Sequence, residues 1–267
     1  MVWAGLCGVW LASLAGAWGC LLVWRRLSYV ADAFAHAALL GIALALWVGL
    51  PPLMGVLVFA VLAALFVLWQ PQVWQETPDA VIMVAAGAAM AAGLFLMQVL
   101  GASNHSMMSY LVGDAAAPGA LYIVIMLVFV LAGTLFLWRF WRTLLTLSMT
   151  PRVAIAEGTH NQTLHFFFMC GVFCLVLLGL RWVGALILTV LLVAPVLTCA
   201  PWVRSPGRCL VMSALGGGGV SAVGWIIAQT TDVALGAIVG VLWGCAVVVS
   251  RTLAWGCGKR REGYAAG

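Results

Sequence analysis

Long apolar runs separated by short polar segments recur along the whole chain of 267 residues. A helix that crosses a bilayer needs about 20 apolar residues, or about 17 at the short end. The two runs beside Leu180 are short, and one of them could be broken or re-entrant, so eight or nine spans are expected. Proline, glycine and charged residues place the predicted spans near 3–24, 30–50, 53–69, 80–100, 119–138, 164–180, 183–201, 209–229 and 233–254.

The composition also indicates a membrane protein. Hydrophobic residues make up 66% of the chain and charged residues only 7%, against about 25% charged residues in a typical globular domain. No polar stretch is long enough to fold as a separate soluble module. We therefore predict an all-α polytopic membrane protein that forms a single transmembrane domain over residues 1–267.

The basic residues predict an orientation in the membrane. With the N-terminus outside, eleven of the twelve Lys and Arg residues fall on the cytoplasmic side, and only Arg181 falls outside. Such a bias is the usual signature of topology, so we expect the N-terminus out and the C-terminus in. The net charge of +5 then reflects arginines at span ends, and we expect no nucleic-acid partner.

Two connections are longer than tight turns. The outer one, residues 101–119, is an extracytoplasmic loop that could contact a partner or a solute. The inner one, residues 139–162, contains TPRVAIAEG, with Thr150 as N-cap, Pro151 at the first helical position and Gly158 as terminator. This pattern predicts a short helix on the cytoplasmic face, suited to docking a cytosolic partner.

The candidate chemistry lies in RRLSYVADAFAHAALLG, where Asp32 and His36 share one helix face. If the helix continues from Arg26, Asp32 lies about 9 Å and His36 about 15 Å into the membrane. Ionisable groups at such depth are costly and are functional candidates. Zinc, manganese and ferrous iron all accept a carboxylate and an imidazole, and two copies on a two-fold axis could surround one ion.

Two other roles for Asp32 and His36 stay open on this evidence: a structural hydrogen bond, and a proton relay in a secondary transporter. On the outer loop, His105, Met107 and Met108 could contact an incoming cation, although a solvated loop is the simpler account. The sequence contains no Walker A motif and no nucleophile–base arrangement, so an enzyme is not expected.

Glycines mark two places of close packing. Gly236, Gly240 and Gly244 repeat every four residues in the last span, as in helix pairs whose backbones approach closely. The run from Gly216 to Gly219 predicts either a local break or a close helix crossing, because four successive glycines weaken a helix.

Several segments together resemble the membrane permease subunit of ABC-type zinc, manganese and iron importers, and most closely the zinc branch. These segments are WRRLSYVADAFAHAALLGIAL (24–44), Asp79 at the head of the fourth span, SYLVGD (109–114), SMTPRVAIAEG (148–158) and RWVGALILTVLLVAPVLT (181–198). They stand in the family's order and cover nearly the whole chain.

This resemblance implies a type II ABC importer architecture in the bacterial cytoplasmic (inner) membrane, with membrane lipid around it. Two permease copies would form the path for zinc, or alternatively manganese or iron, with no permanently bound cofactor. Two cytosolic ABC ATPase subunits and an extracytoplasmic metal-binding protein would be the partners. Asp32 and His36 match the family's metal pair, and the implied coupling residues are Thr150, Pro151, Ala154, Glu157 and Gly158.

Three positions depart from the family pattern. Ala31 stands where a glycine often precedes the motif aspartate, and Arg152 stands where the coupling segment usually has an acidic residue. Pro201 is an additional proline where a more helical continuation is expected. None of these changes removes a metal ligand that the resemblance implies.

Overall fold

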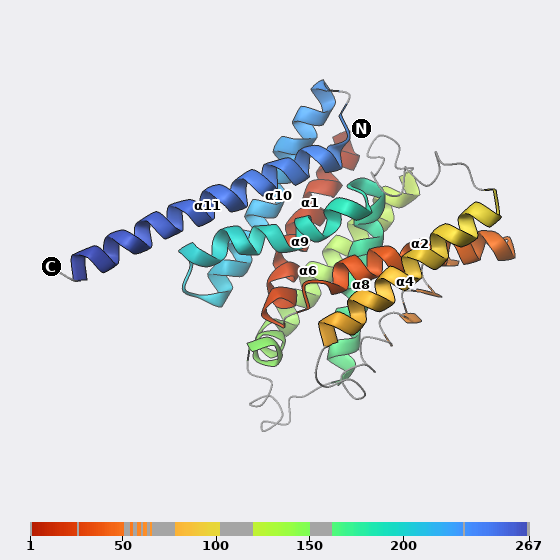
Figure 1. The fold of residues 1–267 in the computed structure, drawn as a ribbon, viewed down its shortest axis with the longest axis horizontal. Coiled ribbons are helices and arrows are strands. Elements are labelled where there is room, and N and C mark those ends of the chain that lie inside the picture. Colours follow the sequence, from red (N-terminus) through yellow and green to blue (C-terminus); the bar gives the residue numbers. More distant parts are fainter. Residues whose placement is uncertain are drawn as a thin grey trace.

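The computed structural model describes most of the chain as helix. The described residues are 2–25, 27–50, 54–55, 58–59, 61–62, 65, 78–101, 120–149, 162–231 and 233–265. Every regular element in these ranges is helical, which confirms the predicted all-α class. The α-helices are α1 (Val2–Trp24), α2 (Val30–Val48), α4 (Pro78–Val99), α6 (Ala120–Met149), α8 (Gln162–Trp182), α9 (Ala185–Cys199), α10 (Pro206–Thr230) and α11 (Leu235–Ala265), and a 3₁₀ turn, η1 (Ala200–Trp202), follows α9 (Figure 1).

The described helices agree with the expected membrane spans. Seven of them are long and apolar enough to cross a bilayer, and a shorter apolar helical stretch covers Ile187–Trp202. The span predicted at 53–69 lies largely outside the described residues. The described part of the chain therefore holds seven full-length spans and one short one.

Helix α6 is longer than predicted. It has 30 residues, or about 45 Å, against a hydrocarbon core of about 30 Å. The predicted start of the inner loop at residue 139 was wrong, because residues 139–149 continue the helix. No glycine or proline interrupts the sequence there before Pro151, and the next helix, α8, begins at Gln162.

Helices α8 and α9 meet at a sharp turn and α9 is short. Gly184, with φ of 92°, precedes α9, a backbone conformation that favours glycine. Helix α9 has 15 residues, or about 22 Å. It contains Pro195 and gives way to η1, which includes Pro201. The sequence departure at Pro201 thus coincides with the end of this helix.

Helix α1 is the centre of the packing. It lies among α6, α8, α9 and α10 (Figure 1), and its residues Leu11, Ala12 and Ala15 are fully buried. Of the two alternatives for the Gly216–Gly219 run, the close crossing is correct, because α10 continues unbroken through it. A Cβ atom on Gly217 would lie only 2.4 Å from the backbone oxygen of Ala12 on α1.

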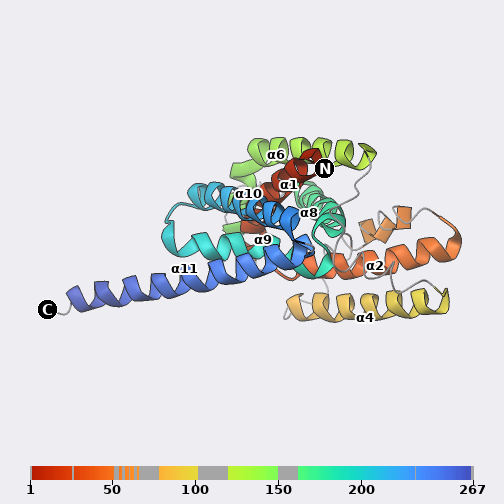
Figure 2. The ribbon, with the colours of Figure 1, turned by 90° about the horizontal axis from the view of Figure 1, so that it is seen from above.

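Helix α2, which carries the candidate site, packs on α4 along one side and on α8 and α9 near its start (Figure 2). Its approach to α4 is close, since a Cβ atom on Gly93 would lie 2.9 Å from the backbone nitrogen of Leu40. Helix α11 packs on α9, where Gly240 faces the side chain of Ile187. No atom lies within 4 Å of a Cβ atom added to Gly244, so the close approach of helix backbones predicted for these glycines is not seen at Gly240 or Gly244 within one copy of the chain.

Candidate metal site

The candidate site lies in the first two turns of α2. The chain turns between α1 and α2, where the backbone N–H of Leu27 donates to the carbonyl of Leu22 at 2.9 Å. The depth estimate that assumed a continuous helix from Arg26 was therefore wrong, because α2 begins at Val30. Asp32 lies in its first turn, where the partial positive charge of the helix N-terminus favours a carboxylate.

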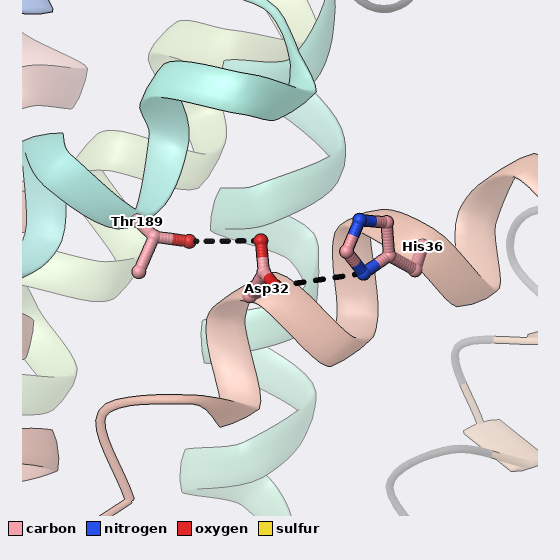
Figure 3. Close-up of polar contacts among 3 residues, drawn as sticks. All are labelled: Asp32, His36 and Thr189. Atoms are coloured by element: carbon pink, nitrogen blue, oxygen red, sulfur yellow. Dashed lines mark hydrogen bonds and ion pairs between the residues drawn. The ribbon is translucent and has the colours of Figure 1, made fainter. Parts of the chain in front are cut away.

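The two predicted side chains do face one another. The Nδ1 atom of His36 lies 3.5 Å from Oδ2 of Asp32, across one helical turn (Figure 3). Their side chains are 21% and 42% exposed, respectively. This partial exposure leaves both groups accessible to an ion.

Thr189 of α9 is a third member of the site that sequence reasoning missed. Its hydroxyl donates to Oδ1 of Asp32 at 3.5 Å, so that the two carboxylate oxygens face different partners (Figure 3). The two residues are 157 positions apart in the chain. The signal available in the sequence was a single hydroxyl in an otherwise aliphatic run, ALILTVLLVA.

Apolar packing holds the two helices of the site in place. On α2, the side chains of Ala31, Phe34 and Ala35 alternate with the site residues and are buried. The Phe34 ring meets Phe173 of α8 edge-on, with centroids 5.2 Å apart, a favoured aromatic geometry. The helix face opposite to the site is thus anchored, which limits the freedom of Asp32 and His36.

The spacing of the donor atoms suits one shared metal ion. Tetrahedral zinc binds nitrogen and oxygen ligands at about 2.0–2.2 Å, which places two of its ligands about 3.4 Å apart. The observed separation of 3.5 Å between His36 Nδ1 and Asp32 Oδ2 is close to this value. No cluster of three His, Cys, Asp or Glu side chains able to hold a metal occurs among the described residues, so any site here would have at most these two such side chains from the described part of one chain.

Arg25 holds the segment just before the site. Its Nε–H donates to the Ser148 hydroxyl of α6 at 2.8 Å, and its guanidinium lies 4.5 Å from the centroid of the Phe168 ring. Burial lowers the pKa of Arg25 to about 10, so that it stays cationic at neutral pH. The α1–α2 turn is therefore tied to the end of α6, next to the predicted coupling segment.

Other predicted functional positions lie outside the described residues. These are the coupling residues Thr150, Pro151, Ala154, Glu157 and Gly158, the outer-loop residues His105, Met107 and Met108, and the motif at 109–114. Asp79 belongs to the first turn of α4.

Comparison with known proteins places these features in one family of transporters. The model of the family described as "ABC 3 transport family" matches residues 1–254. The chain is 29% identical over 217 residues, 79% of its length and 82% of the relative's, to the high-affinity zinc uptake system membrane protein ZnuB of Haemophilus influenzae. It is 26% identical over 223 residues, 84% of its length and 80% of the relative's, to the manganese import system permease protein ScaB of Streptococcus gordonii.

The fold has a close counterpart among solved structures. The structure of PsaBC from Streptococcus pneumoniae in complex with Fab superposes with a TM-score of 0.80 at 25% sequence identity. The match covers 92% of this chain and 89% of that chain. The similarity therefore extends over nearly the whole helical arrangement.

Proposed function

Because the chain belongs to the ABC 3 transport family, we propose that it is the permease of an ATP-driven importer of divalent transition metal ions, with zinc as the principal cargo. Family membership makes it a multi-pass membrane subunit that is not itself an enzyme, since ATP hydrolysis belongs to a separate subunit. The observation that carries the proposal is the accessible pair of Asp32 and His36, 3.5 Å apart at the start of α2.

In the proposed mechanism, an extracytoplasmic binding protein releases the ion into a vestibule between two copies of the chain. Asp32 supplies a carboxylate oxygen and His36 an imidazole nitrogen, which replace part of the ion's hydration shell. The second copy supplies the same pair, because the described part of one chain brings no third such ligand to the site. A transport site must also release its ion, and few ligands of mixed type suit that requirement better than a closed thiolate cage.

Thr189 has a positioning role in this proposal. Its hydroxyl contacts Oδ1 of Asp32 and leaves Oδ2 toward His36. A hydrogen bond of this kind orients a ligating carboxylate and tunes its basicity. Because Thr189 lies on α9, a shift of α9 against α2 would change the orientation of the carboxylate and thereby the affinity for the ion.

The choice of zinc rests on two supports. A relative at 29% identity is a zinc uptake protein, and a carboxylate with an imidazole is a ligand set that zinc accepts. Manganese is the alternative suggested by the ScaB relative, and iron accepts the same ligands. Uptake of the three ions in competition distinguishes between these cargoes.

Coupling to the ATPase is assigned to the segment that follows α6. Thr150, Pro151, Ala154, Glu157 and Gly158 would dock on the ATPase at the cytoplasmic face, with the N-terminus of the chain outside. Movement of that segment would reach the metal site through the end of α6, where Ser148 bonds Arg25 just before α2. Arg152 replaces the usual acidic residue and would require a complementary change on the ATPase.

The test is ion uptake into vesicles that hold the permease, its ATPase and its binding protein. Zinc, manganese and ferrous iron are offered with and without ATP, singly and in competition, to wild type and His36→Ala. We expect ATP-dependent uptake with zinc preferred, and its loss in His36→Ala although the complex assembles normally. His165→Ala, at the start of α8, is the matched histidine control and should transport like wild type.

Two results would contradict the proposal. Full uptake by His36→Ala would assign that histidine a structural role. Uptake that is independent of ATP and is lost when the proton gradient is dissipated would instead favour a secondary transporter that uses Asp32 and His36 for proton coupling.

A further inference from the structure

A groove away from the metal site lies between α1, α6 and α8. Its volume is about 480 Å³, and its lining includes Trp18, Phe129, Phe136, Phe140 and Phe167. On the α6 wall, the small residues Ala132 and Gly133 leave the space that larger side chains would fill. The lining is therefore aromatic and apolar, which is typical of a surface that receives hydrocarbon.

The inner wall of the groove is tightly packed. Trp18 stacks on Phe168 with centroids 5.2 Å apart, and it also contacts Phe136 at 5.9 Å. A Cβ atom on Gly171 would lie 2.0 Å from the Trp18 ring, so that only glycine permits this approach. The shape of the groove is thus set by fixed rings.

The groove opens toward the outside of the helical bundle. Phe167, at its edge, is 57% exposed. The neighbouring outer face of α6 is apolar as well, with Leu131, Leu135 and Trp138 exposed at 56%, 60% and 79%. In a membrane protein such a face contacts lipid, so an acyl chain can enter the groove from the side.

The length of the groove matches one leaflet of the bilayer. Phe129 and Phe140 are 11 residues apart on α6, or about 16 Å along the helix. On α8, Thr163 and Gly171 are 8 residues apart, or about 12 Å. Half of the hydrocarbon core is about 15 Å.

Positive charge lies at one end of the groove. Arg139 follows the start of α6 by 19 residues, or about 28 Å, which brings it to the boundary of the hydrocarbon core. Its guanidinium lies 5.4 Å from the centroid of the Phe140 ring that lines the groove. Arg142 is exposed one turn further on. Within the described part of the chain, neither arginine has a carboxylate partner.

From this combination of shape, length and charge we infer that the groove binds one anionic glycerophospholipid from the leaflet on the side of the coupling segment. One acyl chain lies against the rings of Trp18, Phe136 and Phe140, and the phosphate lies at Arg139 and Arg142. Basic positions between membrane helices attract anionic headgroups in this way. The site is independent of which metal the protein transports.

The test uses the full-length chain in nanodiscs of phosphatidylcholine that contain a small fraction of photoreactive lipid. The lipid carries a diazirine on one acyl chain and has either a phosphatidylglycerol or a phosphatidylcholine headgroup. Cross-linked residues are mapped by mass spectrometry. We expect the phosphatidylglycerol probe to label residues 129–140 and 163–171 more strongly than the phosphatidylcholine probe.

Two pairs of variants distinguish binding of the lipid headgroup from binding of the acyl chain in the groove. Arg139→Gln should lower labelling by phosphatidylglycerol about fivefold, whereas Arg251→Gln, an exposed arginine on α11, should leave it unchanged. Ala132→Phe fills the groove and should lower labelling by both probes, whereas Leu131→Phe, on the outer face of α6, should not.

Equal labelling by the two headgroups, or labelling in the groove that survives both Arg139→Gln and Ala132→Phe, would overturn the inference. Thermal unfolding monitors whether Ala132→Phe is folded. If Ala132→Phe is not folded, the Arg139→Gln result decides by itself, because Arg139 is exposed and its replacement leaves the apolar lining of the groove in place.

Discussion

The crossing of α1 and α10 and the start of α2 are built in opposite ways. At the crossing, Gly217 is buried directly against the backbone of Ala12, and Gly16 of α1 approaches the carbonyl of Ser213 so closely that a Cβ atom there would lie 2.2 Å away. At the start of α2, Asp32 and His36 are partly exposed and their contacts measure 3.5 Å.

The difference separates a region that holds the helices together from a region that, in the proposed function, binds and releases an ion. In a bilayer, helices associate through close packing of small residues because lipid is as apolar as the protein core. The glycine crossing therefore contributes stability and leaves no room for a ligand. In the proposed function, the partly exposed Asp32 and His36 take up and release an ion without disturbing that packing.

The largest effect is expected from Gly217→Ala. The added Cβ would lie 2.4 Å from the Ala12 oxygen, and the crossing helices would have to separate, at a cost of about 3 kcal/mol. The thermal unfolding midpoint in detergent, followed by tryptophan fluorescence, should fall clearly.

The matched control is Gly219→Ala, two residues further along the same helix. No atom lies within 4 Å of a Cβ atom at this position, so the variant should gain about 1 kcal/mol from helix propensity. Equal effects of the two alanines would show that the crossing is not close in the folded protein.

A smaller loss is expected from Ser148→Ala, which removes the acceptor of the Arg25 Nε–H bond. Loss of a hydrogen bond to a charged group costs about 1.5–3 kcal/mol. The unfolding midpoint should fall. As a control, Thr252→Ala removes an exposed hydroxyl and should leave the midpoint nearly unchanged. An unchanged midpoint in Ser148→Ala would remove the proposed tie between the α1–α2 turn and α6.

The smallest effect on stability, and a selective effect on transport, is expected from Thr189→Val. This change keeps the volume of the side chain but removes the hydroxyl that contacts Asp32. The apparent affinity for zinc in the uptake assay should fall about tenfold, with an unfolding midpoint close to that of wild type.

Thr189→Ser restores the hydroxyl and should restore the affinity. If valine and serine behave alike, Thr189 does not position the carboxylate, and the site is then limited to Asp32 and His36.

Much of this architecture follows from the order of residues alone. Apolar runs long enough to cross a bilayer require helices, because every backbone polar group must be satisfied within the membrane. The spacing of Asp32 and His36 by four positions places them on one helix face, and they do lie together. Both inferences depend only on local geometry.

Other features depended on contacts between distant segments. The helix that carries the site begins at Val30 and not at Arg26, because the chain turns back on the end of α1. From the sequence alone, the glycine run from 216 to 219 is consistent with either a break or a crossing. In the structure the backbone of α1 lies against this run, which identifies a crossing. Thr189 joins Asp32 across 157 positions only because α9 packs beside α2.

The sequence by itself thus determined the helical membrane class and the local pairing of Asp32 with His36, because hydrophobic length and helical periodicity act within one segment. The tertiary structure decided where α2 begins, how α10 crosses α1 and which hydroxyl faces Asp32. These depend on which helix surfaces meet, and that is set by the packing of the whole bundle.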